Sequence, residues 1–109
     1  MSTPDPDAES TAEGLSDDDL HLALEAVRDP VRRSILRQLA AVPDWSLACG
    51  MFDVPVGKAT MSHHFGVLRH AGLVDQREDG RRTLNRLPRE DIDRRFPGLL
   101  ALVLDAQPE

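Results

Sequence analysis

The sequence predicts a mainly helical α+β domain that contains a β-hairpin, and three features carry this prediction. Apolar residues recur at helical spacing through most of residues 17–70. After Gly72 the spacing changes to the alternation of strands, over 73–77 and again over 81–87. Glu78-Asp79-Gly80 separates these two runs, and Asp-Gly is a strong hairpin signal. About five to six helices and one two-stranded hairpin are therefore expected.

Residues 1–14 carry no pattern of a folded element. They contain prolines, small polar residues and acids without apolar periodicity, so they bury too little surface to become ordered. We expect a disordered acidic N-terminal tail over 1–14 and one domain over 15–109.

Two helices begin at clear capping signals. Ser16, followed by three aspartates, predicts a helix over about 17–27, whose apolar face carries Leu20, Leu24 and Val27. Asp29-Pro30 predicts the next start, because proline is favoured at the first helical position. This second helix should end near 41. Its expected buried side is Val31, Ile35, Leu36 and Leu39, and its expected exposed side is Arg32, Arg33 and Arg37.

A short third helix is expected to contain Leu47, Ala48, Met51 and Phe52, with Asp44 or Ser46 as its cap. Trp45 is interpreted as a core anchor at the preceding turn. Pro55 and Gly57 then predict a turn.

A helix follows this turn and should end at Gly72, which suits the positive φ of a C-terminal cap. Met61, Phe65 and Leu68 fall on one side of it with His64 beside them, which indicates a buried face. The outer side instead carries small, polar or cationic residues near the helix start, namely Lys58, Thr60, Ser62 and His63. Such a face fits a DNA major groove. The alternative is an ordinary surface helix in a small bundle.

Two helices joined by a short glycine-containing turn, followed by a hairpin, make a winged helix-turn-helix. Four arginines mark the hairpin as a DNA-contacting wing: Arg77, Arg81, Arg82 and Arg86. Arginines on a wing can enter the adjacent minor groove. The alternative is that charged edge strands only discourage aggregation between sheets.

The net charge of −6 argues at first against a nucleic-acid partner. The acids are concentrated at the N-terminus, since residues 1–25 hold eight acids and no Lys or Arg. Residues 58–89, in contrast, hold seven bases and three acids, a net of +4. The basic part thus coincides with the candidate DNA surface, while the acidic tail either solubilises the chain or competes weakly for that surface.

The C-terminal segment predicts a homodimer. Pro88 begins a short helix that Pro97-Gly98 interrupts, and residues 99–104 are apolar nearly all round. Such a segment needs more than one surface to cover it, and a second copy would supply one. The expected twofold interface consists of Leu20, Leu24, Leu99, Leu100, Leu102 and Val103.

Three stretches at linked spacing together resemble the ArsR (ArsR/SmtB-type) winged helix-turn-helix transcriptional regulators. They are residues 24–36 (LEAVRDPVRRSIL), 62–69 (SHHFGVLR) and 71–74 (AGLV). The resemblance implies a homodimeric DNA-binding repressor that an unidentified effector releases from its operator. It also implies operator contacts from Lys58, Thr60, Ser62 and His63, with Gly80–Arg82 as the tip of the wing.

The chain departs from this family in its candidate sensor residues. Members that sense thiophilic metals usually carry Cys-x-Cys on their third helix, whereas this chain has one cysteine, Cys49. Others bind metal on the last helix through Asp and His, and here Asp91 and Asp93 have no histidine near them. We therefore predict no metal site and no cofactor; a mixed site from Cys49, His21, His70 and acids is the alternative. Cys49 is either an oxidant-sensitive thiol or a small buried hydrophobe.

No catalytic arrangement of residues is apparent, so no enzyme activity is expected. The longest apolar run has six residues, which is too short to span a membrane, and the N-terminus lacks the pattern of a signal peptide, so a cytoplasmic location is the expectation. The alternative function is a winged-helix module for protein contacts without specific DNA binding.

Overall fold

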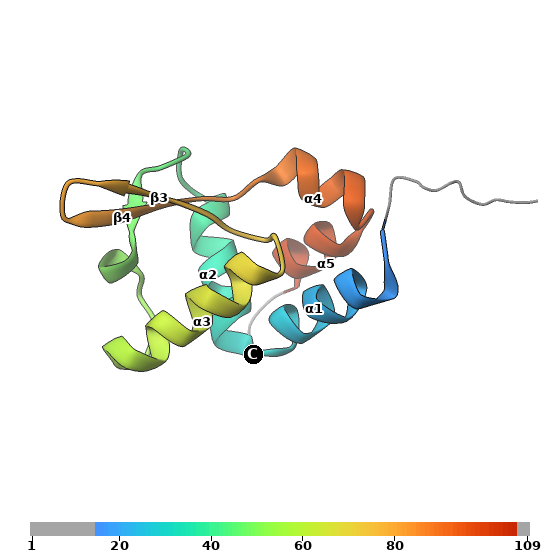
Figure 1. The fold of residues 1–109 in the computed structure, drawn as a ribbon, viewed down its shortest axis with the longest axis horizontal. Helices are drawn as coiled ribbons and strands as arrows, with labels where there is room; N and C mark the ends of the chain where they lie inside the picture. The colour runs from blue at the N-terminus through green and yellow to red at the C-terminus, as the bar shows by residue number, and fades with distance from the viewer. Residues whose placement is uncertain (1–14, 107–109) are drawn as a thin grey trace, which may run out of the picture.

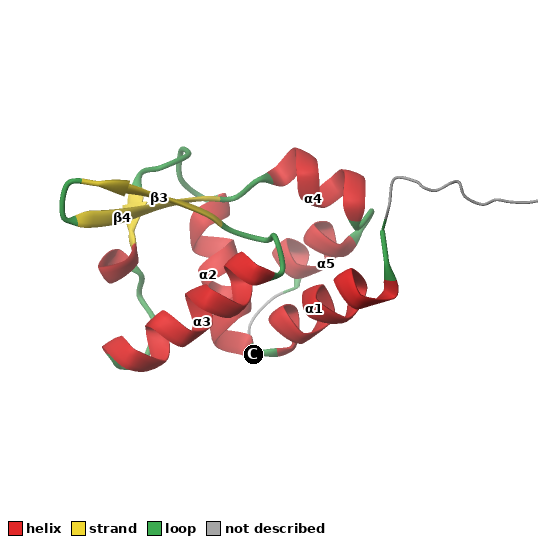
Figure 2. Ribbon diagram, in the orientation of Figure 1, coloured by secondary structure: helices red, strands yellow, loops and turns green. Residues whose placement is uncertain are grey.

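The computed structural model describes residues 15–106, so the prediction for the tail over 1–14 lies outside the described residues. Within the described range the chain forms helices that pack together, with a small sheet at one end (Figures 1 and 2). The helices are α1 (Asp17–Arg28), α2 (Pro30–Ala40), the 3-10 helix η1 (Cys49–Met51), α3 (Lys58–His70), α4 (Arg89–Arg95) and α5 (Leu99–Asp105). The strands are β2 (Leu47–Ala48), β3 (Asp75–Asp79) and β4 (Arg82–Arg86), in the antiparallel order β2-β4-β3. The predicted mainly helical fold with a hairpin wing is confirmed.

Both predicted N-terminal caps form. The hydroxyl of Ser16 accepts a hydrogen bond from the backbone N–H of Asp19 at 3.0 Å, at the start of α1. The carboxylate of Asp29 accepts from the N–H groups of Val31 (2.7 Å) and Arg32 (3.2 Å), at the start of α2. These bonds satisfy donors that the first helical turn leaves without an intrahelical partner, so both helices begin where the sequence predicts.

The C-terminal end of α3 also follows the prediction. Gly72 has a φ of 79°, its N–H donates to the carbonyl of Arg69 at 3.0 Å, and the N–H of Leu73 donates to the carbonyl of Leu68 at 3.0 Å. This pair of bonds is a Schellman motif, which ends a helix and turns the chain sharply. The motif directs the chain from α3 into the wing.

The prediction of a short helix around residues 47–52 is wrong. Leu47 and Ala48 instead form β2, opposite Asn85 and Leu84 of β4, and only the single turn η1 follows. Ser46 does not cap a helix, because its hydroxyl donates to the carbonyl of Pro43 at 2.6 Å. Pairing with β4 has overridden a weak local helix preference, so the sheet has three strands rather than two.

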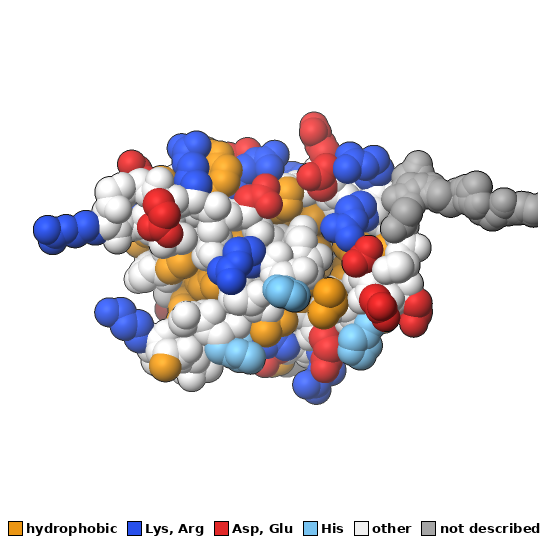
Figure 3. Space-filling view, in the orientation of Figure 1, with side chains coloured by type: hydrophobic (Ala, Val, Ile, Leu, Met, Phe, Trp, Pro, Cys, Tyr) orange, Lys and Arg blue, Asp and Glu red, His pale blue; other side chains and the backbone are white. Residues whose placement is uncertain are grey.

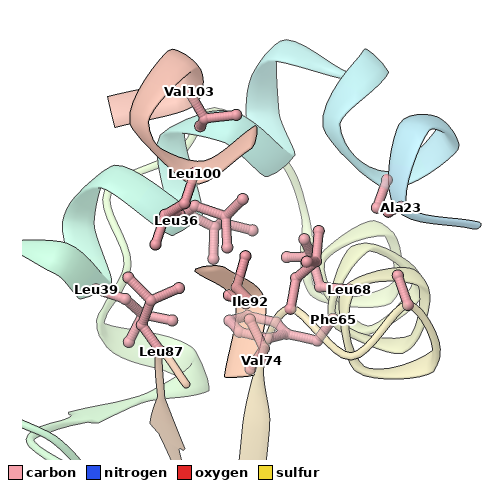
Figure 4. Packing of buried hydrophobic residues seen from close by; sticks show 14 of the residues in the cluster. Ala23, Leu36, Leu39, Phe65, Leu68, Val74, Leu87, Ile92, Leu100 and Val103 are labelled. Atoms are coloured by element: carbon pink, nitrogen blue, oxygen red, sulfur yellow. The ribbon is translucent and has the colours of Figure 1, made fainter. Parts of the chain in front are cut away.

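The core draws on every α-helix within the described residues and on the segments that flank the wing. Figure 4 shows Leu36 of α2, Ile92 of α4 and Leu100 of α5 packed near one another, with Leu68 of α3 on the side toward α1. Helix α1 contributes Ala23 and Ala26 to this core, and both are fully buried. Small residues allow α1 to pack against α2 and α3, while Leu20 and Leu24 remain exposed.

Arginines hold the C-terminal ends of three helices. Arg32 was expected on the exposed side of α2, but it is buried, and it donates to the carbonyls of Ala26 (2.8 Å) and Glu25 (3.0 Å) in α1. The other bonds of this kind run from Arg33 to Val27 and Arg28, from Arg37 to Val103, and from Arg89 to Ala40. Cationic donors near a helix C-terminus are favoured by its dipole and by its unpaired carbonyls.

Candidate nucleic-acid interface

The outer face of α3 has the polar character that the sequence predicts. Lys58, Thr60, Ser62 and His63 are all exposed, whereas Phe65 and Leu68, on the inner side, are buried. The first turn of α3 contains no acid and begins with Lys58. Figure 1 shows that this start and the tip of the wing lie at the same end of the molecule. One protomer can therefore present both elements to one partner.

The wing ends in a two-residue turn that carries an exposed cation. Asp79 pairs with Arg82, so Gly80 and Arg81 form the turn, and Gly80 adopts the positive φ of 66° that its first position requires. Arg81 and Arg82 are exposed, and neither takes part in an ion pair within the described residues. These two arginines suit contact with phosphates.

The other two predicted wing arginines are engaged by the protein itself. The guanidinium of Arg77 lies 4.5 Å from the centre of the Trp45 ring. Arg86 forms ion pairs with Asp44 (2.9 Å) and Asp75 (3.0 Å), and these hydrogen bonds, that of Asp44 first, raise the pKa of Arg86 above its ordinary value. Strand alternation places Arg77 and Arg86 on the same side of the hairpin.

Trp45 is not the core anchor that the sequence suggested. It is half-exposed, it has a φ of 65°, and its N–H donates to the carbonyl of Asn85 at 3.0 Å. Its indole instead packs under a cationic side chain, an arrangement that favours tryptophan over other aromatics. Trp45 therefore positions Arg77 on the wing.

The side of the hairpin that faces α3 carries a polar network. Arg69 of α3 donates to the carbonyl oxygen of the Gln76 side chain at 2.8 Å, and the Gln76 amide donates to the Asn85 side chain at 2.9 Å. Asn85 is fully buried, and its amide donates to the backbone carbonyl of Leu47 at 3.0 Å. The Gln76 amide also lies 3.3 Å from the thiol sulfur of Cys49. This network joins α3, both strands of the wing and η1.

Sequence reasoning missed this network because the register of the hairpin was not determined. The predicted turn Glu78-Asp79-Gly80 is wrong, because β3 continues to Asp79 and the turn is Gly80-Arg81. The observed turn, unlike the predicted one, places Gln76 opposite Asn85. Two amide side chains at matching positions of neighbouring strands were the available signal. The pairing could be found only by testing both turn registers.

A second polar contact lies beneath α3. His64 is buried, and its Nδ1 lies 3.1 Å from a terminal nitrogen of Arg32. Arginine is always a donor, so Nδ1 accepts and the imidazole is neutral. Burial is the main cause that lowers the pKa of His64; the charge of Asp29 opposes it, and the charges of Arg32 and His63 lower the pKa again. This contact ties the inner side of the candidate recognition helix to α1 and α2.

The predicted dimer residues fall into two groups. Leu102, Leu24 and Leu20 are exposed by 72%, 50% and 37%, and Leu99 is half-buried. Leu100 and Val103, in contrast, are buried in the core of the protomer, which corrects their assignment to an interface. Exposed leucines of α1 and α5 border a hollow of about 510 Å³ that Phe96 and Leu99 also line. An apolar surface remains available to a second copy.

Residues 15–106 contain no cluster of three or more His, Cys, Asp and Glu side chains that could hold a metal ion. The structure thus does not bring Cys49, His21 and His70 together as the mixed site would require. Over the same residues, no helix is long and apolar enough to cross a bilayer.

Comparison with known proteins relates the chain to transcriptional regulators. No family profile and no curated protein matches the sequence. The transcriptional repressor BigR from Xylella fastidiosa is 22% identical, with 84% of this chain and 91% of that chain covered and a TM-score of 0.60. A structure described as a possible transcriptional regulator for arsenical resistance is 33% identical, with 78% and 96% covered and a TM-score of 0.48. The chain has the winged helix-turn-helix fold of the repressor BigR, as its resemblance to ArsR-type regulators predicts.

Proposed function

We propose that this chain is a sequence-specific DNA-binding regulator of the ArsR type, which acts as a homodimeric repressor. The observation that carries the proposal is the placement of two exposed cationic elements at one end of the protomer, neither of which forms an ion pair with any of residues 15–106. These elements are the first turn of α3, with Lys58, and the tip of the wing, with Arg81 and Arg82. The BigR-like fold supports the same assignment.

Each element has a distinct role in this proposal. Ser62 and His63, on the outer face of α3, contact base edges in the major groove, because short hydroxyl and imidazole side chains can reach them. Lys58, Arg81 and Arg82 contact phosphates and position the protein on the duplex. Thr60 is also exposed, in the first turn of α3, and adds a hydroxyl donor.

The exposed leucines of α1 and α5 support a dimer. Figure 3 shows orange hydrophobic side chains on the viewed face near α1, in addition to those between the wing and α3. A twofold dimer formed through Leu20, Leu24, Leu99 and Leu102 presents two recognition helices. These helices enter successive major grooves about 34 Å apart, so the operator is a pseudo-palindrome.

Selection of DNA from a random pool by the full chain tests this proposal. We expect enrichment of a pseudo-palindromic site, with binding that weakens steeply as the salt concentration rises. Changes at Ser62 or His63 should alter the preferred sequence. Binding that is indifferent to both sequence and salt would contradict the proposal and favour a module for protein contacts.

A further inference from the structure

A hollow of about 650 Å³ lies between α3, η1 and the α3-facing side of the wing. It lies where the extended segment 52–57 and the single turn η1 run beside α3, at the position for which the sequence had suggested a longer helix. Figure 3 shows hydrophobic side chains exposed between the wing and the start of α3. The volume lies within the range of about 300–1,000 Å³ that small-molecule sites occupy.

The walls of this hollow are mainly apolar, and only a few charged groups line it. Val54, Val56, Met61 and the aromatic pair Phe52 and Phe65 line it, and the rings of that pair lie 5.1 Å apart in an edge-to-face arrangement. Phe52 is 8% exposed and Phe65 2%, so this pair forms the base of the hollow. A flat apolar or aromatic body would fit against such a wall.

Two cations and one acid stand around the hollow. They are Lys58 and Arg69 of α3 and Glu78 of β3. None of the ion pairs formed within residues 15–106 involves Lys58 or Arg69. The side chain of Arg69 donates instead to the neutral side chain of Gln76. The hollow therefore has an excess of uncompensated positive charge beside an apolar wall.

We propose that this hollow binds a small aromatic carboxylate, with its ring on the Phe52–Phe65 wall and its carboxylate toward Arg69 and Lys58. We further propose that occupation weakens DNA binding, and this second part rests on the function proposed above. Lys58 and Ser62 line the hollow and also belong to the proposed DNA-contacting face. A carboxylate on Lys58 takes a cation from the phosphates, and by linkage DNA lowers the ligand affinity by the same factor.

The polar network gives the ligand a second way to act. Gln76 and Arg69 both line the hollow, and their hydrogen bond of 2.8 Å joins α3 to β3. A carboxylate that binds Arg69 competes with the Gln76 oxygen for the same donors. The orientation of the wing relative to α3 is then no longer fixed by that bond.

Titration of the DNA-free protein with 2-naphthoate tests the site. Calorimetry and amide chemical shifts in NMR spectra monitor this titration. We expect saturable binding with shifts that concentrate on residues 49–62, 69 and 76–83, and weaker binding of the neutral 2-naphthamide. Glu78→Gln should tighten binding about fivefold and Arg69→Gln should weaken it about fivefold, as expected for one partly exposed charge pair. Arg94→Gln, on the exposed surface of α4, is the matched control and should leave the affinity unchanged.

Glu78→Gln is the decisive variant, because a gain in affinity cannot result from misfolding. Absence of saturable binding, shifts located elsewhere, or equal binding of the amide would overturn the site. In the presence of the selected operator, 2-naphthoate should lower the DNA affinity of wild type; an unchanged affinity would overturn the coupling. Failure to bind any DNA would contradict the proposed function and leave the result of the DNA-free titration standing.

Discussion

At the scale of single residues, His64 is the clearest source of pH dependence. The imidazole accepts a hydrogen bond from Arg32 only when it is neutral, and burial lowers its pKa in the folded protein. Above the ordinary histidine pKa of about 6.5, both the folded and the unfolded chain hold a neutral imidazole. As the pH falls below that value, the unfolded chain takes up the proton first, so the free energy of unfolding decreases.

We therefore expect wild type to lose stability between pH 7.5 and 5.5, by at most about 1.4 kcal/mol per pH unit from this residue. His64→Gln should flatten this dependence, because an amide oxygen can accept from Arg32 without titrating. Ser62→Ala, at an exposed position of the same helix without a titrating side chain, should keep the wild-type slope. Urea unfolding at several pH values measures all three proteins, and equal slopes would show that His64 is not the responsible group.

At the scale of elements, the end of α3 sets the direction of the wing. Gly72 has a φ of 79°, and a Cβ at this position would lie 2.8 Å from a terminal nitrogen of Arg95. Gly72→Ala should therefore lower the free energy of unfolding by about 1–2 kcal/mol, because alanine must adopt a left-handed conformation.

Gly66, within the same helix, is the matched control. A Cβ at Gly66 meets nothing within 4 Å, so Gly66→Ala should stabilise the protein by about 0.5–1 kcal/mol through helix propensity. Urea unfolding followed by circular dichroism distinguishes the two signs. A loss of stability in both variants would mean that the helix end is not the sensitive feature.

Local signals in the sequence predicted some elements and not others. The caps at Ser16 and Asp29 and the helix end at Gly72 were predictable, because each depends on residues within one turn. The strand β2 was not, since its formation depends on pairing with β4 nearly 40 residues away. The same limit applies to the site: exposure on α3 follows from helical periodicity, whereas the engagement of Arg86 by Asp44 depends on how β2 brings its loop to the wing.

The wing arginines can be separated by their salt dependence. If Lys58, Arg81 and Arg82 contact phosphates in both protomers, six contacts predict a slope of log K against log salt of about −5. Arg81→Ala combined with Arg82→Ala removes four of them and should reduce the slope to about −2, with a similar loss for all DNA sequences. Arg86→Ala should leave the slope near −5, because Arg86 is already paired with Asp44 and Asp75. Fluorescence anisotropy at several salt concentrations measures these slopes, and a large effect of Arg86→Ala would contradict the assignment.

At the scale of the whole molecule, the proposed dimer depends on the exposed leucines of α1 and α5. Leu102 is exposed by 72%, so Leu102→Glu should leave the protomer folded and place a charge in the apolar interface. We expect a monomer in light scattering where wild type is a dimer, and a large loss of operator affinity, because one protomer contacts only one half-site.

Met51→Glu is the control for this variant. Met51 is exposed by 54% but belongs to η1, near the wing, so the substitution should leave the dimer intact. A wild-type protein that is monomeric, or a Leu102→Glu variant that remains dimeric, would contradict the proposed interface.

Several arginines donate to the carbonyl groups at helix ends, and this reduces the number of arginines that can bind nucleic acid. Arg32, Arg33, Arg37 and Arg89 each donate to a backbone carbonyl, so these side chains are held in the protein and do not neutralise phosphates or release the counterions of a duplex. The number of arginines in the sequence therefore overstates the attraction of this protein for nucleic acid in general. We therefore expect this protein to bind non-specific DNA weakly, so that the lifetime of its complex with the operator depends on a few base contacts.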